Sequence, residues 1–158
     1  MKAEKTELVK VENLIRQIVM LKNQLQELGV LQGGDQICSD YAKWFCSVKF
    51  DLELCDRKKL GYDAFSKFGK RVQIESRLGS DVDFSIRFDI QGDAFDYLLL
   101  VFVNESTWMI DSIYKVSHGI VTKFLICDQK SKFEWKRESR SLSEQLYPDE
   151  ENMLSPVL

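Results

Sequence analysis

The sequence predicts one α/β (α+β) domain, with a mixed central sheet flanked by helices, and a long N-terminal helix ahead of it. Residues 5–28 contain neither proline nor glycine and carry an apolar repeat of helical period. Several short runs between residues 50 and 116 alternate apolar and polar side chains, as strands do. Residues 95–103 are apolar with one exception, which is typical of a central strand covered on both faces.

The composition fits a single ordinary domain of 158 residues, with 22 Lys and Arg against 25 Asp and Glu. A net charge of −3 gives no global attraction to nucleic acid, although a local basic patch can provide one. Four cysteines without a CxxC pair indicate reduced thiols and a cytoplasmic protein. We expect no membrane contact, because no signal peptide or long apolar run is present. His118 is the only histidine, which argues against catalytic triads and zinc centres.

The N-terminal helix carries a heptad pattern within the predicted segment 1–32. Ile15 and Val19 widen its apolar stripe, as in a helix that docks on its own domain. β-branched residues at the first heptad core position, with Leu at the second, favour a two-stranded parallel coil instead. A homodimer, a partner protein and intramolecular docking are therefore all open. The heptad core positions are Val11, Leu14, Ile18, Leu21, Leu25 and Leu28.

A linker at residues 33–35 leads into the predicted domain, residues 35–140. Ser39 is expected to cap a helix with Asp40 in its first turn. Ser117 is expected to cap a second, short helix that ends near residue 125. Residues 141–158 read as a loose, acidic tail. The expected strands are 50–54, 71–78, 84–88, 95–103 and 109–116, with a hairpin over 61–78 that turns at 68–70.

One strand of this hairpin presents three polar side chains on the same face: Gln73, Glu75 and Arg77. A solvated strand face would explain them. Asp63, on the preceding strand, could instead point into the same space and meet Glu75. Two carboxylates so close repel each other, and a divalent cation such as Mg²⁺ is the usual relief.

Four segments together resemble the PD-(D/E)xK nuclease superfamily, which has the restriction-endonuclease-like fold. The resemblance covers residues 39–127. It implies a helix packed on a mixed sheet and a hairpin that presents an Asp, then an acidic residue or Gln, then a Lys two positions later. The segments are 61–64 (GYDA), 69–77 (GKRVQIESR), 95–101 (FDYLLLV) and 113–116 (IYKV).

The resemblance implies that Asp63 is the first metal ligand, that Gln73 takes the acidic-or-Gln position and that Asp40 is the assisting helix acid. Mg²⁺ or Mn²⁺ is the implied cofactor. The family's Lys position holds Glu75, an anion that would repel the phosphate of a substrate. Arg77 could restore a positive charge and clamp a phosphate, but it cannot accept a proton.

Three functions are consistent with this pattern. A metal-dependent nuclease would use Asp63 and Glu75 as ligands and Arg77, or a lysine, for charge stabilisation. Alternatively, the fold persists as a module that binds DNA or a nuclease without cleaving, or the chain is an unrelated, dimerising interaction module. Basic residues around the hairpin would contact nucleic acid, unless they only form a solvated surface: Lys59, Lys70 and Arg71.

Overall fold

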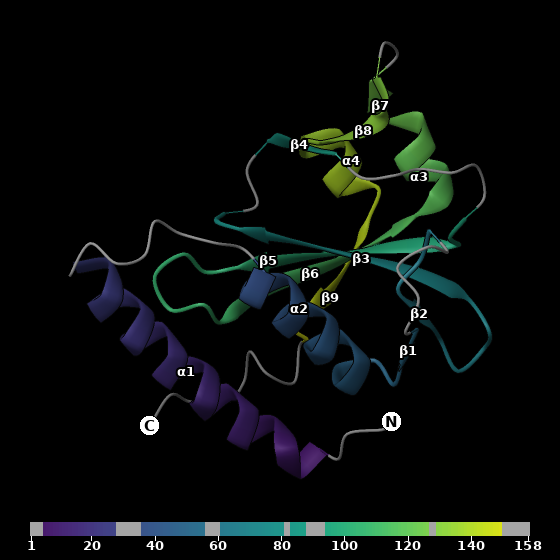
Figure 1. The fold of residues 1–158 in the computed structure, drawn as a ribbon. Helices are drawn as coiled ribbons and strands as arrows, with labels where there is room; N and C mark the ends of the chain where they lie inside the picture. The colour runs from purple at the N-terminus through teal and green to yellow at the C-terminus, as the bar shows by residue number, and fades with distance from the viewer. Residues whose placement is uncertain are drawn as a thin grey trace.

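The computed structural model places two helices on one face of a six-stranded sheet and a smaller sheet with short helices on the other (Figure 1). This arrangement confirms the predicted α+β domain with a mixed sheet, flanking helices and an N-terminal helix. No helix in the described part of the chain is long and apolar enough to cross a membrane. The structure describes residues 5–27, 36–55, 61–80, 83–87, 94–126 and 129–149.

The main sheet has the strand order β1-β2-β3-β5-β6-β9. Its pairs are antiparallel, except that β3 runs parallel to β5 with Ile74 beside Leu99. The predicted hairpin is confirmed, because β2 pairs with β3 and Gly69 adopts the left-handed φ of 75° that its turn requires. The strands are β1 (Glu53–Leu54), β2 (Ala64–Phe65), β3 (Arg71–Leu78), β5 (Tyr97–Val103), β6 (Ile110–Ser117) and β9 (Glu144–Tyr147).

The second layer covers the opposite face of β5 and β6 and has its own apolar core, which includes Phe102, Phe133 and Trp135. Ser117 caps α3 as predicted, since its Oγ accepts a hydrogen bond of 3.3 Å from the Ile120 amide. The elements of the second layer are β4 (Phe84–Arg87), β7 (Leu125–Ile126), β8 (Gln129–Trp135), α3 (His118–Lys123) and α4 (Arg137–Ser141).

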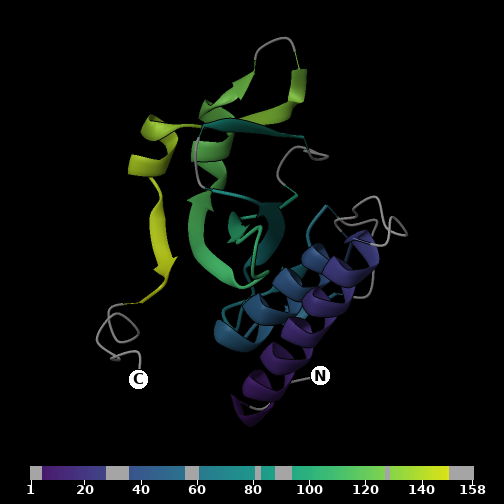
Figure 2. The same cartoon turned by 90° about the vertical axis from the view of Figure 1, so that its left-hand side faces the viewer.

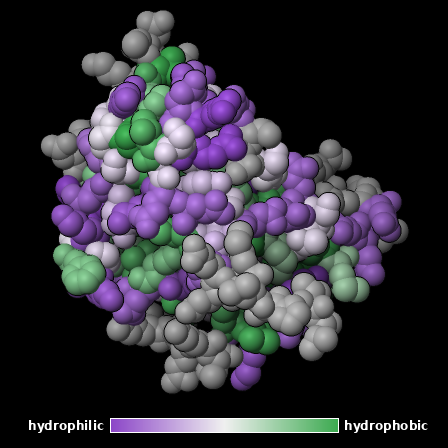
Figure 3. Space-filling view, turned by 180° about the vertical axis from the view of Figure 1, so that it is seen from behind, coloured by the Kyte–Doolittle hydropathy of each residue, from purple (hydrophilic) through white to green (hydrophobic). Residues whose placement is uncertain are grey.

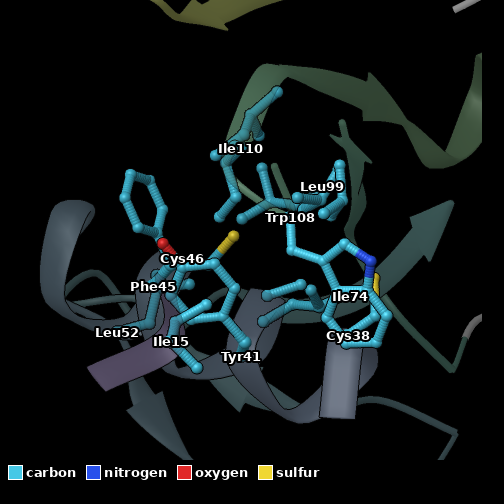
Figure 4. Packing of buried hydrophobic residues seen from close by; sticks show 14 of the residues in the cluster. Ile15, Cys38, Tyr41, Phe45, Cys46, Leu52, Ile74, Leu99, Trp108 and Ile110 are labelled. Atoms are coloured by element: carbon cyan, nitrogen blue, oxygen red, sulfur yellow. The ribbon is translucent and has the colours of Figure 1, made fainter. Parts of the chain in front are cut away.

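The first core lies between the main sheet and α2 (Gln36–Lys49), as Figure 4 shows. Tyr41, Phe45 and Cys46 project from α2 toward Ile74 and Leu99 of the sheet. Cys46 is fully buried, and burial raises the pKa of its thiol, so this side chain acts as a small apolar group. The continuously apolar β5 is buried on both faces, as its sequence predicts.

Helix α1 (Lys5–Glu27) docks on this same core and forms the outermost layer (Figure 2). Ile15 and Val19 are buried at the contact, and the Lys22 ammonium lies 3.7 Å from the centre of the Trp108 ring. The intramolecular alternative is thus confirmed for one face of the helix. Helix α1 contributes side chains to the domain's core, and the division at residue 32 stays a prediction.

The expected bounds of two elements around the first core, a helix and a strand, are wrong. Helix α2 begins at Gln36, so Ser39 lies inside the helix and caps nothing. Packing explains the extra turn, since Cys38 is 2% exposed within the core. The strand expected at 50–54 shrinks to β1, because Asp51 has a left-handed φ of 55° that an extended strand cannot contain.

The expectation of a loose tail from residue 141 is also wrong over Glu144–Tyr147. This segment is strand β9, an edge strand that pairs with β6. Tyr147 packs edge-on against Phe45, with ring centres 5.4 Å apart, so apolar contact holds an otherwise polar segment in place. Residues 150–158 and the linker at 33–35 lie outside the described residues.

Candidate functional site

The candidate site forms where α2 meets the hairpin of β2 and β3. Asp63 lies just before β2, and its backbone is fixed on both sides. Its amide donates to the Val72 carbonyl at 2.8 Å, and its carbonyl accepts from the Cys55 amide at 2.8 Å. The carboxylate is therefore carried by a rigid part of the sheet.

Both carboxylate oxygens of Asp63 have partners. Lys43 of α2 places its Nζ 2.8 Å from Oδ1, and the Ile74 amide donates to Oδ2 at 2.8 Å. The exposed fractions of the Asp63 and Lys43 side chains are 18% and 36%, so this ion pair is partly shielded from water. Both oxygens of the Asp63 carboxylate are therefore satisfied, one of them by a cation.

Glu75 lies in the same electrostatic environment but is harder to ionise. Burial raises the pKa of its carboxyl group above the ordinary 4.5, although the hydrogen bond from Gln73 opposes this increase. The negative charge of Asp63 raises this pKa further, while the charge of Lys43 lowers it. The bond from Gln73 Nε2 to Glu75 Oε1 is 2.9 Å long. The structure therefore brings Asp63, Gln73 and Glu75 together with Lys43.

Arg77 and Asp40 occupy other surroundings. The Arg77 guanidinium lies 3.8 Å from the centre of the Phe84 ring in the second layer. Arg77 also lines a hollow of about 400 Å³ with Cys38, Ser76 and Leu78. Asp40 is exposed on α2, three residues before Lys43. The charge expected from Arg77 beside the carboxylates is provided by Lys43 instead.

The Arg71 side chain, which is predicted to contact nucleic acid, pairs with Asp96 in the structure. Arg71 Nε and Nη2 each donate to the Asp96 carboxylate at 3.2 Å, and the Arg71 amide donates to it at 2.8 Å. These hydrogen bonds lower the pKa of Asp96 and tie β3 to the start of β5. Lys70 is exposed at the hairpin tip next to Arg71. Lys59 lies outside the described residues.

The sequence reasoning missed Lys43. One signal was present: Lys43 is the single charged residue in the otherwise largely apolar stretch 41–48 of the helix. A charge in such a stretch usually finds a partner or reaches solvent along its own stem. Its partner is 20 residues away in sequence, so helical periodicity alone could not identify Asp63.

These residues do not form a ready site for Mg²⁺ or Mn²⁺. Such ions prefer ionised oxygen ligands, and one of the two carboxylates, Glu75, resists ionisation. The Lys43 ammonium also occupies the side of Asp63 Oδ1 that an ion would approach. A divalent ion could bind Asp63 and Glu75 only after Lys43 moved.

No protein-family model matches the chain, and no curated protein matches it.

Proposed function

We propose that this chain is a nuclease-related, nucleic-acid-interacting protein of the restriction-endonuclease-like fold, with an altered site that binds without cleaving. One observation carries the proposal: Lys43 pairs with Asp63 at 2.8 Å while Glu75 stands at the family's Lys position. The cation of the site has in effect moved from the strand to the helix, and an anion has taken its former place.

The arrangement of the elements supports the fold assignment. A helix, α2, packs on a mixed sheet, and the β2–β3 hairpin sets Asp63 close to Gln73 and Glu75. Strand β3 then runs parallel to β5 in the centre of the sheet. The connection between these two strands passes through β4 of the second layer.

The charges of the site support binding without cleavage. Metal-assisted hydrolysis needs an ion that activates water and offsets the charge developing on the phosphate. In this chain Asp63 already pairs with Lys43, and burial raises the pKa of the Glu75 carboxyl group above its ordinary value. A raised pKa makes Glu75 easier to neutralise, so its burial is compatible with a bound phosphate backbone.

Exposed cations at the hairpin support the choice of nucleic acid as the ligand. Lys67 and Lys70 are exposed on either side of the turn, and the Ser66 Oγ accepts from the Lys70 amide at 3.1 Å to hold that turn. Two lysines fixed in this way can each neutralise one phosphate. We extend the same role to Lys59 as a prediction.

Binding is tested by fluorescence anisotropy with labelled duplex and single-stranded DNA across a salt series. We expect affinity to fall as salt rises, and the logarithmic slope to become shallower by about 1 in Lys70→Ala, since one phosphate contact is lost. Lys123→Ala is the matched control, because Lys123 is also exposed but lies on α3. Absence of binding at low salt would overturn the proposal in favour of a protein-interaction module.

An active Mg²⁺- or Mn²⁺-dependent nuclease is a second candidate, favoured by one observation. Two carboxylates and one ammonium share the site, which is the charge set expected of the family with the ammonium supplied by Lys43. In that case Asp63 and Glu75 would be the ligands. Metal-dependent cleavage by the wild-type chain distinguishes this candidate from the proposal.

A further inference from the structure

The turn between β2 and β3 carries the most exposed of the large apolar side chains that the structure describes. Phe68 is 81% exposed at the tip of this turn. A Cβ atom added at the neighbouring Gly69 would have no described atom within 4 Å, so the tip projects away from the rest of the domain. Neither apolar core includes the Phe68 ring. The ring is therefore accessible to another molecule.

Hydrogen bonds close the turn that carries Phe68. The Gly69 amide donates to the Ser66 carbonyl at 2.8 Å, and the Ser66 amide donates to the Lys70 carbonyl at 2.8 Å. The Ser66 Oγ accepts from the Phe68 amide at 3.3 Å and from the Lys70 amide at 3.1 Å. A backbone that is fixed before binding loses little conformational entropy when a ligand arrives. The turn therefore presents the Phe68 ring in a defined position.

Two lysines flank the ring and give the turn a positive charge. The Lys67 Nζ lies over the Phe68 ring, 5.2 Å from its centre, and Lys70 follows two residues after Phe68. Neither lysine forms an ion pair with the residues that the structure describes. Asp96, whose charge interacts with Lys70, is itself bound by Arg71. A planar group with negative charge beside it therefore complements the turn.

We propose that Phe68 stacks on an unpaired base of a nucleic acid while Lys67 and Lys70 contact the adjoining phosphates. This inference deepens the proposed function and rests on it. Every base has a planar π face next to its phosphates, so an aromatic ring between two ammonium groups binds a nucleotide of any sequence. A base inside a duplex is already stacked on its neighbours, whereas an unpaired base is free to stack on a side chain. The turn should therefore select single-stranded segments.

A lipid surface is the other ligand that combines apolar groups with negative charge. Lasting attachment to a bilayer needs a large apolar face or more than one anchor. On the side of the molecule seen in Figure 3, apolar side chains form only small, separate patches among hydrophilic ones. One ring is sufficient to stack on one base, so the isolated Phe68 suits a nucleotide better than a membrane.

Fluorescence anisotropy of the full chain tests the proposal with three labelled ligands of equal length. They are an oligothymidine, the same deoxyribose-phosphate chain without bases, and a duplex. We expect the wild type to bind the oligothymidine roughly 5- to 100-fold more tightly than the chain without bases, and Phe68→Ala to bind these two ligands equally. Phe68→Tyr keeps the aromatic ring and should keep the preference, whereas Phe68→Leu keeps only apolar bulk and should lose most of it. Duplex affinity should be the same in all these variants.

The controls separate this inference from the proposed function. Leu142→Ala should bind like the wild type, because Leu142 is also an exposed apolar residue but lies at the end of α4. Equal affinity of the wild type and Phe68→Ala for the oligothymidine overturns the stacking and leaves the proposed function in place. Failure to bind any of the three ligands at low salt overturns the proposed function, and the stacking with it. Binding to phosphatidylserine vesicles that needs Phe68, while oligothymidine binding does not, overturns the stacking in favour of a lipid surface.

Discussion

Replacement of Lys43 by methionine should tighten the binding of a divalent ion at Asp63. In the wild type an incoming ion competes with the Lys43 ammonium, which lies 2.8 Å from Oδ1. Methionine keeps the length and apolar stem of the side chain but removes its charge. Among the residues that the structure describes, the polar partner that the Asp63 carboxylate keeps is then the Ile74 amide.

The size of the effect follows from the exposure of the ion pair. Two unit charges about 4 Å apart interact by about 4 kcal/mol at an effective dielectric constant of about 20. Lys43 is 36% exposed, so solvent screening reduces this to about 1–2 kcal/mol. Since about 1.4 kcal/mol corresponds to a tenfold change, we expect Lys43→Met to bind Mn²⁺ roughly 5- to 30-fold more tightly.

Electron paramagnetic resonance of free Mn²⁺ measures this affinity directly. Lys49→Met is the matched control, because Lys49 is on the same helix and pairs with Asp149 at 3.0 Å, away from the site. The control should bind Mn²⁺ like the wild type. Equal affinity in Lys43→Met and the wild type, or an equal gain in both variants, would refute the account of the ion pair.

Three further predictions concern stability, each measured by urea unfolding. Because burial raises the pKa of Glu75 in the folded chain, the free energy of unfolding falls as pH rises above 4.5. Glu75→Gln should therefore be more stable than the wild type at pH 7 and equally stable near pH 3. A difference that stays constant with pH would contradict this. Asp96→Ala should lose about 1 kcal/mol with the bonds from Arg71, whereas an unchanged midpoint would mean the clamp contributes nothing. Ile15→Ala should lose about 2 kcal/mol, and a loss below about 0.5 kcal/mol would mean that α1 is not docked.

Local sequence patterns predicted those strands whose pattern of apolar and polar residues is compatible with a single structure. A continuous apolar run became the central strand β5, and the alternating residues 71–78 became β3 with its hairpin. The apolar repeat of α1 was consistent with docking on the domain and with dimerisation, because the docked face and the exposed heptad face lie side by side on the helix. Only the burial of Ile15 and Val19 shows which face docks.

The remaining features depend on contacts between distant parts of the chain. β9 is polar and short, and it is held by pairing with β6 and by the contact of Tyr147 with Phe45. In the candidate site, the proximity of Asp63 and Glu75 followed from the hairpin, whereas Lys43 reaches them from α2 through tertiary packing. The pairing of Arg71 with Asp96 could not be predicted for the same reason, since Asp96 lies 25 residues away.

Cleavage of labelled plasmid and single-stranded DNA in Mg²⁺ or Mn²⁺ tests the central claim most directly. The wild type is compared under identical conditions with Asp63→Ala, with Glu75→Lys and with Glu75→Lys combined with Lys43→Met. The altered site predicts no cleavage by the wild type. It predicts cleavage only when Glu75→Lys, which restores a cation at the family's position, is combined with Lys43→Met, which frees Asp63 for the ion. Cleavage by the wild type that Asp63→Ala abolishes would contradict the account and establish an active metal-dependent nuclease.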